Sequence, residues 1–264
     1  RNRTSPFAFT GNKFEFRMVG SSFSLAGPNI VINTAVADVL REFADQLEGA
    51  ADFNAALHDL VADTIKENKR IIFNGNNYSE EWAKEAKKRG LLNLKNSAEA
   101  LPHFADKKNI ELFERNGVFT AREVETRTEI MLENYSKVLT IEALTMLEMA
   151  RRDIYPAVNA YIDSLCATVR SKKKADESLQ CGAEQRLIAK LTAYSEEMFD
   201  GTDELEALLA DAKNCKDAKT EAVFFAEKVL PVMEKIRSCA DACEGLVSGQ
   251  YWPLPTYGEL LFSV

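Results

Sequence analysis

The sequence has no long hydrophobic run. No apolar stretch in its 264 residues comes close to the roughly 18 uninterrupted residues that a membrane-spanning helix needs. Residues 1–5 also lack the apolar stretch of a signal peptide. With 46% hydrophobic and 28% charged residues, the composition is typical of a soluble globular chain that forms one large domain or two modest ones. We therefore expect a cytoplasmic protein with no membrane partner.

Basic residues are outnumbered, and histidine is scarce. Lys and Arg total 33 against 41 acidic residues, a net charge of −8, which argues against a nucleic-acid partner held through phosphates. The acidic total still allows one small basic pocket. Only His58 and His103 occur, and both lie beside apolar residues, so we interpret them as packing residues. Any chemistry must then depend on carboxylates, Arg and Lys.

The five cysteines are an odd number in a chain too large to depend on disulfides, so reduced thiols are expected. Cys239 and Cys243 are one helical turn apart and could share a metal ion. Both fall on an apolar stripe with no histidine nearby, which favours core packing over metal ligation.

Period-two alternation is confined to residues 1–27, and helical spacing dominates beyond Pro28. The predicted fold class is therefore an α-rich α+β fold, with a short β-strand segment at the N-terminal end followed by a multi-helix C-terminal region. The capping and periodicity signals predict helices at about 28–49, 53–69, 79–89, 120–152, 183–199, 203–214 and 217–247.

Two prolines and one charged stretch interrupt the helical pattern. Pro156 should kink or end the long helix near Arg152, and Pro231 should kink the last helix. Residues 172–178 are predicted to form a linker. The last helix carries an apolar seam that fits either bundle core or a subunit interface, formed by Val223, Ala226, Leu230, Met233, Ile236, Ala240, Cys243 and Val247.

The segment 12–19 is the most informative for chemistry. Its alternation places Lys13, Glu15 and Arg17 on one face of a strand. Three charges in a row must face a hydrated or ligand-filled space, because desolvating them unpaired would cost many kcal/mol. An edge strand with a surface salt-bridge ladder satisfies the same alternation, and alternation alone favours that simpler interpretation.

A family resemblance shifts this balance. Asn2-Arg3-Thr4-Ser5, followed by Lys13-Phe14-Glu15-Phe16-Arg17 and Ser21-Ser22, resembles the end of the catalytic domain of glutamine synthetase. The sequence of residues 2–22 resembles that of the large type III branch of the family. Segments similar to the same branch continue along the chain, at residues 28–31, 73–78, 101–104, 116–120 and 255–262.

The resemblance implies ATP-dependent formation of glutamine from glutamate and ammonia through a γ-glutamyl phosphate. Glu15 matches a metal-binding glutamate suited to Mg²⁺ or Mn²⁺. Arg3 matches an arginine that meets the transferring phosphoryl group, and Arg17 one that contacts the phosphorylated substrate. Lys13 falls near the nucleotide phosphates, where relatives commonly carry arginine. Arg3 and Arg17 are thus the catalytic candidates, Arg3 and Lys13 the ATP-binding candidates, and Glu15 the metal ligand.

The sequence departs from the family pattern in two ways. Ala8 stands where other branches place a further phosphate-binding arginine, and the interval from Arg3 to Glu15 looks shorter than theirs. The family's other metal ligands and its main substrate-binding residues would precede Arg1. Because one carboxylate cannot form a two-metal site, we expect the chain to be a piece of a longer enzyme and to be inactive by itself.

By resemblance, residues 1–139 form the C-terminal part of the catalytic domain, whose barrel supplies the short strand, and residues 140–264 form a helical extension. The resemblance also implies a ring-stacked homo-oligomer, such as a dodecamer, with active sites between subunits. Two alternatives remain: a non-catalytic helical assembly or regulatory module derived from the enzyme, and a different ATP-dependent ligase that uses an acyl phosphate.

Overall fold

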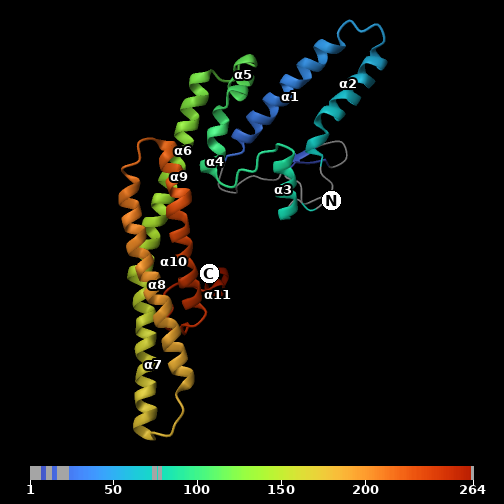
Figure 1. Cartoon of the computed structure of the whole chain (residues 1–264). Coiled ribbons are helices and arrows are strands. Elements are labelled where there is room, and N and C mark those ends of the chain that lie inside the picture. Colours follow the sequence, from blue (N-terminus) through green and yellow to red (C-terminus); the bar gives the residue numbers. More distant parts are fainter. Residues whose placement is uncertain (1–6, 10–13, 17–23, 73–75, 77–78, 263–264) are drawn as a thin grey trace. The chain divides into compact units, whose positions relative to one another are not determined.

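The computed structural model describes residues 7–9, 14–16, 24–72, 76 and 79–262 (Figure 1). The chain divides into two compact units. The first unit comprises residues 1–95 and 102–128, and the second comprises residues 96–101 and 129–264. No helix among the described residues combines the length and the apolarity that a bilayer crossing requires.

The predicted α+β fold class is wrong for the described residues, which are helical almost throughout. The β-structure described is one antiparallel pair, β1 (Phe7–Phe9) and β2 (Phe14–Phe16), in which Ala8 lies opposite Glu15. Within the described part of the chain, these two strands pair with each other and with no further strand. Two three-residue strands cannot form a sheet layer or a barrel wall, because each strand of a barrel needs a partner on both sides. The described residues therefore belong to the all-α class, and the short strand pair does not alter this assignment.

Local capping signals define the helices of the first unit. They are α1 (Ala26–Leu47), α2 (Phe53–Asn68), the 3₁₀ turn η1 (Lys69–Ile71), α3 (Glu80–Lys88) and α5 (Lys107–Arg115). Asp52 caps α2 by accepting from the Ala55 amide, and Ser79 caps α3 by accepting from the Trp82 amide. Gly90 follows α3 with a φ of +72°, a left-handed value that favours glycine. These helices confirm the predicted ones at 28–49, 53–69 and 79–89.

The second unit is a bundle of three long helical rods. The first rod joins α6 (Ala121–Met149), which begins in the first unit, through η3 (Ala150–Ile154) to α7 (Tyr155–Ala175). The second is α8 (Gly182–Ala212), and the third joins α9 (Ala218–Phe224), η4 (Phe225–Val229) and α10 (Leu230–Glu244). α8 packs along both α7 and α10 (Figure 1). The short helices α4 (Ser97–Ala100) and α11 (Tyr257–Phe262) complete this unit, and the 3₁₀ turn η2 (Leu101–Ala105) follows α4.

Both prolines follow a five-residue π turn, where the backbone amide bonds one residue further back than in an α-helix. The Tyr155 amide donates to the Ala150 carbonyl, and the Leu230 amide donates to the Phe225 carbonyl. The extra residue relieves the clash that a proline ring would make with the carbonyl four residues earlier. The helices at Pro156 and Pro231 therefore continue, whereas the sequence predicted a kink or an end.

The π turn in the third rod also moves its apolar seam. The predicted positions from Met233 to Val247 are buried. Up to the end of the π turn, the seam is displaced by one residue, so that Ala222, Phe225 and Val229 are fully buried where Val223, Ala226 and Leu230 were predicted. The seam belongs to the bundle core, whose buried members are Leu139, Ala143, Leu147, Ala150, Ile154, Val158, Leu165, Leu191, Met198, Leu205, Ala212, Phe225, Val229, Val232, Met233, Ile236, Cys239, Ala240, Cys243 and Val247.

Two further predictions about the second unit are wrong. The helices predicted at 183–199 and 203–214 form the single helix α8. The predicted linker at 172–178 begins too early, because α7 runs to Ala175 and its lysines occupy the last helical turn, where cations interact favourably with the helix dipole. Lys172 pairs there with Glu184 of α8, an interaction between residues twelve positions apart that local sequence pattern does not show.

Gly201 allows α8 and α10 to approach closely. It is buried in the middle of α8, and a Cβ added there would lie 2.9 Å from Cγ1 of Ile236. Ile236 is itself only 1% exposed and has little room to move. The helix therefore tolerates a residue of low helix propensity because the neighbouring rod occupies the space of a side chain.

We predict that Gly201→Ala lowers the free energy of unfolding by about 1 kcal/mol, since overpacking costs about 1–3 kcal/mol and the gain in helix propensity offsets about 0.5–1 kcal/mol. Gly182→Ala is the matched control, because its Cβ would meet only the tip of the flexible Arg186 side chain, at 3.4 Å. Urea denaturation of both variants tests the prediction, and equal stabilisation by the two substitutions would contradict it.

Three of the five thiols are buried, Cys181, Cys239 and Cys243, and the last two belong to the bundle core. Core packing, the favoured interpretation for Cys239 and Cys243, is thus confirmed. Burial, with a smaller contribution from neighbouring Cys239, raises the pKa of the Cys243 thiol to about 11.

We predict that a thiol reagent labels Cys166 and Cys215 first in the native chain at pH 8, because both are half-buried. A pKa of about 11 leaves about one in a thousand Cys243 groups as the reactive thiolate. Colorimetric counting should show two fast thiols, with Cys243 labelled only on unfolding; labelling of Cys243 as fast as Cys166 would refute this.

Candidate functional site

The side chains of the predicted site residues lie outside the part of the chain that the structure describes. This holds for Arg3, Lys13, Glu15 and Arg17. The backbone of Glu15 lies in β2, opposite Ala8 of β1. The hairpin therefore places the predicted metal ligand directly across from the position where other branches carry an arginine. The roles of Arg3, Lys13, Glu15 and Arg17 stay predictions.

A polar cluster connects α1 to the end of α5 within the first unit. Asp38 is 6% exposed, and its carboxylate accepts two bonds from the Arg115 guanidinium, one of them from Nε at 2.9 Å. The Asn116 side chain donates to the same carboxylate at 2.9 Å and accepts from Arg41 at 2.8 Å. Fork-shaped pairing of this kind fixes geometry as well as charge. Because α1 buries only Thr34 and Asp38, this cluster is its principal polar anchor among the described residues.

The segment at 116–120, one of those that resemble the type III branch, has a structural role here. Gly117 has a φ of +64°, a conformation that glycine adopts readily. The Phe119 ring packs edge-on against Phe113, with centroids 5.3 Å apart, and Arg127 stacks over Phe119 at 4.5 Å. Thr120 and Glu123 form a capping box at the start of α6, with reciprocal bonds of 2.8 and 3.3 Å, where the sequence predicts that the long helix begins. The segment thus turns the chain from α5 into the long helix.

The Arg115 guanidinium, assisted by the Asn116 amide, holds the pKa of the Asp38 carboxyl well below its usual value of 3.8, although partial burial acts in the opposite direction. A carboxyl whose pKa is lower in the folded state contributes stability above its unfolded pKa. That contribution is present in full above about pH 5 and is lost as the pH falls through the folded value.

We predict that Asp38→Asn lowers the Tm of the chain by several degrees at pH 7, because the Arg115 charge is left without its partner. The difference from wild type should shrink as the pH falls from about 5 to 2, since protonation of Asp38 removes the same interaction. Thermal melts across this range test the prediction, with Asp63→Asn as a control on an exposed pair of α2. A Tm difference independent of pH would contradict it.

A second polar feature of the first unit is a basic hollow of about 660 Å³ at the end of α2. Four cationic residues line it, Lys66, Lys69, Arg70 and Arg89. Two of the four are already engaged: Arg89 donates to Glu85 and to the carbonyls of Arg70 and Ile72, and Lys66 pairs with Asp63. Lys66 and Arg89 therefore lie at the C-terminal ends of helices, where free carbonyls and the helix dipole attract cations.

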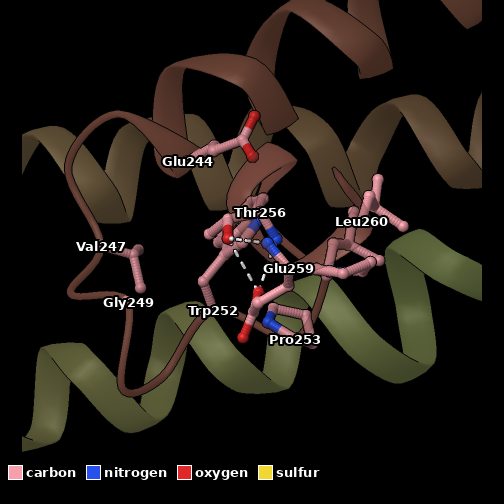
Figure 2. A pocket seen from close by; sticks show the side chains of 10 residues that line it. Glu244, Val247, Gly249, Trp252, Pro253, Thr256, Glu259 and Leu260 are labelled. Atoms are coloured by element: carbon pink, nitrogen blue, oxygen red, sulfur yellow. Dashed lines mark hydrogen bonds between the residues drawn. The ribbon is translucent and has the colours of Figure 1, made fainter. Parts of the chain in front are cut away.

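The second unit contains two hollows beside the segment that follows α10. Figure 2 shows the first, of about 660 Å³, in which Trp252 and Pro253 lie below Glu244 and beside the start of α11. Thr256 and Glu259 form a capping box here, with the Thr256 amide donating to the Glu259 carboxylate at 2.7 Å. The second hollow, of about 610 Å³, lies between α6, η3, α10 and the same segment, and its walls are mainly apolar.

No group of three His, Cys, Asp or Glu side chains among the described residues is arranged to hold a metal ion. His103 is bonded locally: its Nδ1 lies 2.9 Å from an oxygen of Asp106, and its carbonyl accepts from Asn109 at 2.6 Å. The packing interpretation of His103 stays a prediction.

The sequence interpretation did not identify Asp38, Arg115 or the hollow around Trp252. Asp38 could have been noticed as an acidic residue on the apolar stripe between Val36 and Leu40. The hollow had no sequence signal, because its walls come from residues more than a hundred positions apart.

Comparison with known proteins supplies the class of the chain. Residues 56–173 match the family model of the glutamine synthetase C-terminal domain. The chain is 35% identical to type-3 glutamine synthetase of Dictyostelium discoideum over 99% of its length, and 37% identical to a glutamine synthetase of Butyrivibrio fibrisolvens over 100%. A glutamine synthetase of Bacteroides fragilis is 32% identical, also over 100% of the chain.

The chain therefore belongs to the glutamine synthetase family, as its motifs indicated. The likeness to the type-3 enzyme confirms the resemblance to the type III branch. The chain spans only 37–38% of the length of these relatives and corresponds to their C-terminal part.

Proposed function

We propose that this chain is the C-terminal part of an ATP-dependent glutamate–ammonia ligase. The observation that carries the proposal is similarity to glutamine synthetases along the whole chain, including the segment with Arg3, Glu15 and Arg17. In the proposed reaction, the side-chain carboxylate of glutamate attacks the γ-phosphorus of ATP and ADP leaves. Ammonia then attacks the acyl carbon, loses a proton and displaces phosphate, which gives glutamine.

The residues of this chain would act on the anionic groups of that reaction. The guanidinium groups of Arg3 and Arg17 match the planar oxyanions of the transferring phosphoryl group and of the phosphorylated substrate. Lys13 adds a point charge near the nucleotide phosphates. Each residue stabilises charge that develops during phosphoryl transfer, which is the main form of catalysis available to such a reaction.

This segment offers a ligand of the kind that a divalent cation needs, but it does not offer enough ligands to form a complete site. The Glu15 carboxylate is a hard oxygen ligand of the kind that Mg²⁺ and Mn²⁺ prefer, and it would be one ligand among several. The remaining ligands must come from the parts of the enzyme that precede this chain. When bound, the metal would neutralise charge on the nucleotide phosphates.

We further propose that the parent enzyme is a cytoplasmic, ring-stacked homo-oligomer, such as a dodecamer, with active sites between subunits. The exposed apolar side chains of α1 and α2 support this proposal, because another subunit could cover them. Val36, Leu40, Val61 and Ile65 are 49–59% exposed. Exposed apolar surface of this extent marks contact regions.

The alternative is a non-catalytic helical module derived from the enzyme. The described residues favour neither possibility, because their polar clusters have structural roles. The sequence that precedes Arg1 in the gene discriminates between them: a β-rich region with further Glu and His ligands supports the ligase, and its absence supports the module.

We predict that the 264-residue chain forms no glutamine by itself, because Glu15 alone cannot complete a metal site. In the parent enzyme, Arg17→Ala should lower kcat by about 100-fold or more, the usual cost of removing one oxyanion donor. Arg122→Ala, at an exposed position of α6, should leave kcat unchanged. Phosphate release and glutamine formation measure both, and glutamine formation by the isolated chain would refute the prediction.

A further inference from the structure

The second unit contains the Trp252 pocket, the cavity of about 610 Å³ between α6, η3, α10 and the segment at 252–255. Met146 and Met149 line it from the first rod, Ile236 from the third, and Trp252 from the segment after α10. Ligand pockets for small molecules occupy about 300–1,000 Å³ and have mainly apolar walls. The Trp252 pocket has both properties, and flexible Met side chains let such walls adapt to an occupant.

The polar residues at the rim of the Trp252 pocket carry an excess of negative charge. Glu142 of α6 and Glu244 of α10 line it from different helices, and Arg237 of α10, which also lines it, interacts through its charge with Glu244 as well as with Asp241. A third carboxylate, Asp241, is bonded to Arg237 at 2.7 Å, so that these two charges cancel. The three carboxylates Glu142, Asp241 and Glu244 outnumber the single cation Arg237, so the rim carries an excess of negative charge. A cation in the pocket would be attracted by this excess, whereas an anion would be repelled.

Trp252 adds a third feature that favours a cation. Its indole ring is half-buried and lines the pocket, and the electron-rich face of an indole attracts ammonium groups more strongly than the other aromatic rings do. The indole nitrogen is buried and has no hydrogen-bond acceptor among the described residues. The ring is therefore held by packing alone, and it can adjust to an occupant without breaking a hydrogen bond.

We propose that the Trp252 pocket binds an apolar organic cation, a small molecule with a compact apolar body and one ammonium group. The body would cover the Met and Ile walls, and the ammonium group would lie between Glu142, Glu244 and the indole. A neutral ligand of the same size would desolvate the carboxylates without compensation. The pocket shares no residue with Arg3, Lys13, Glu15 or Arg17, so the proposal does not depend on the proposed ligase activity.

The test compares three probes that share a phenylethyl body: 2-phenylethylammonium, 2-phenylethanol and 3-phenylpropionate. The chain has two tryptophans, so Trp82→Phe leaves Trp252 as the only indole, and its fluorescence reports binding. Calorimetry gives the affinities. We expect the ammonium probe to bind about tenfold or more tightly than the alcohol, the carboxylate not to bind, and added salt to weaken the ammonium complex. Equal affinity of the ammonium probe and the alcohol overturns the proposal.

Variants locate the binding and keep the test independent of folding. Glu142→Gln and Glu244→Gln should each weaken the ammonium probe about three- to tenfold and leave the Tm unchanged, since both side chains are exposed. Glu234→Gln is the matched control, on the same helix as Glu244 but away from the pocket, and should bind as wild type. Thr145→Phe, which adds a ring at the wall, should abolish binding while the chain stays folded.

Three results would overturn the proposal. The first is unchanged affinity in the Glu142→Gln Glu244→Gln double variant. The second is retained binding in a folded Thr145→Phe variant. The third is an affinity that falls as the chain concentration rises, because this would show that a second copy of the chain, and not a small molecule, occupies the pocket.

Discussion

The continuity of two helical rods across internal prolines is the constraint on which the second unit depends. Pro156 and Pro231 each remove an amide donor and would break a regular α-helix, at a cost of about 3 kcal/mol. The π turns at 150–154 and 225–229 insert one residue before each proline and let the rods continue. This insertion also rotates the buried face, so that Phe225 and Val229 enter the core in place of their neighbours. The Trp252 pocket lies against the first of these turns, which supplies Ala150 and Ile154 to its wall.

The two units are stabilised in different ways. The second has a continuous apolar core along three rods, with Gly201 allowing a close approach of α8 to α10. In the first unit, α2 has no buried residue and α1 buries only Thr34 and Asp38, so that α1 depends on its polar bonds to Arg115 and Asn116. An element held by one polar cluster needs further contacts to remain ordered. This difference agrees with the proposal that the chain is the C-terminal part of a larger enzyme, in which other regions or subunits would cover α1 and α2.

The proposed chemistry and the described architecture occupy different parts of the chain. The residues proposed for phosphoryl transfer lie in the first seventeen positions of the sequence. The segments at 101–104 and 116–120, which carry the same family resemblance, act instead through packing and capping, as Phe119 and Thr120 show. Resemblance to a family motif therefore does not by itself assign a catalytic role, because the contacts of Phe119 and Thr120 are structural.

The sequence by itself determined the family, the predominance of helix, and the helix ends marked by Asp52, Ser79 and Thr120, because these signals act within a few residues. It did not determine the fold class, since an alternating run of eight residues predicts a strand without showing whether a sheet forms around it. The unbroken α8 and the buried pairing of Asp38 with Arg115 were decided only by tertiary structure. Each depends on residues distant in the sequence: Ile236 occupies the space beside Gly201, and Arg115 compensates a carboxylate 77 positions away. Local pattern contains no information about such partners, because packing chooses among the conformations that the local sequence allows.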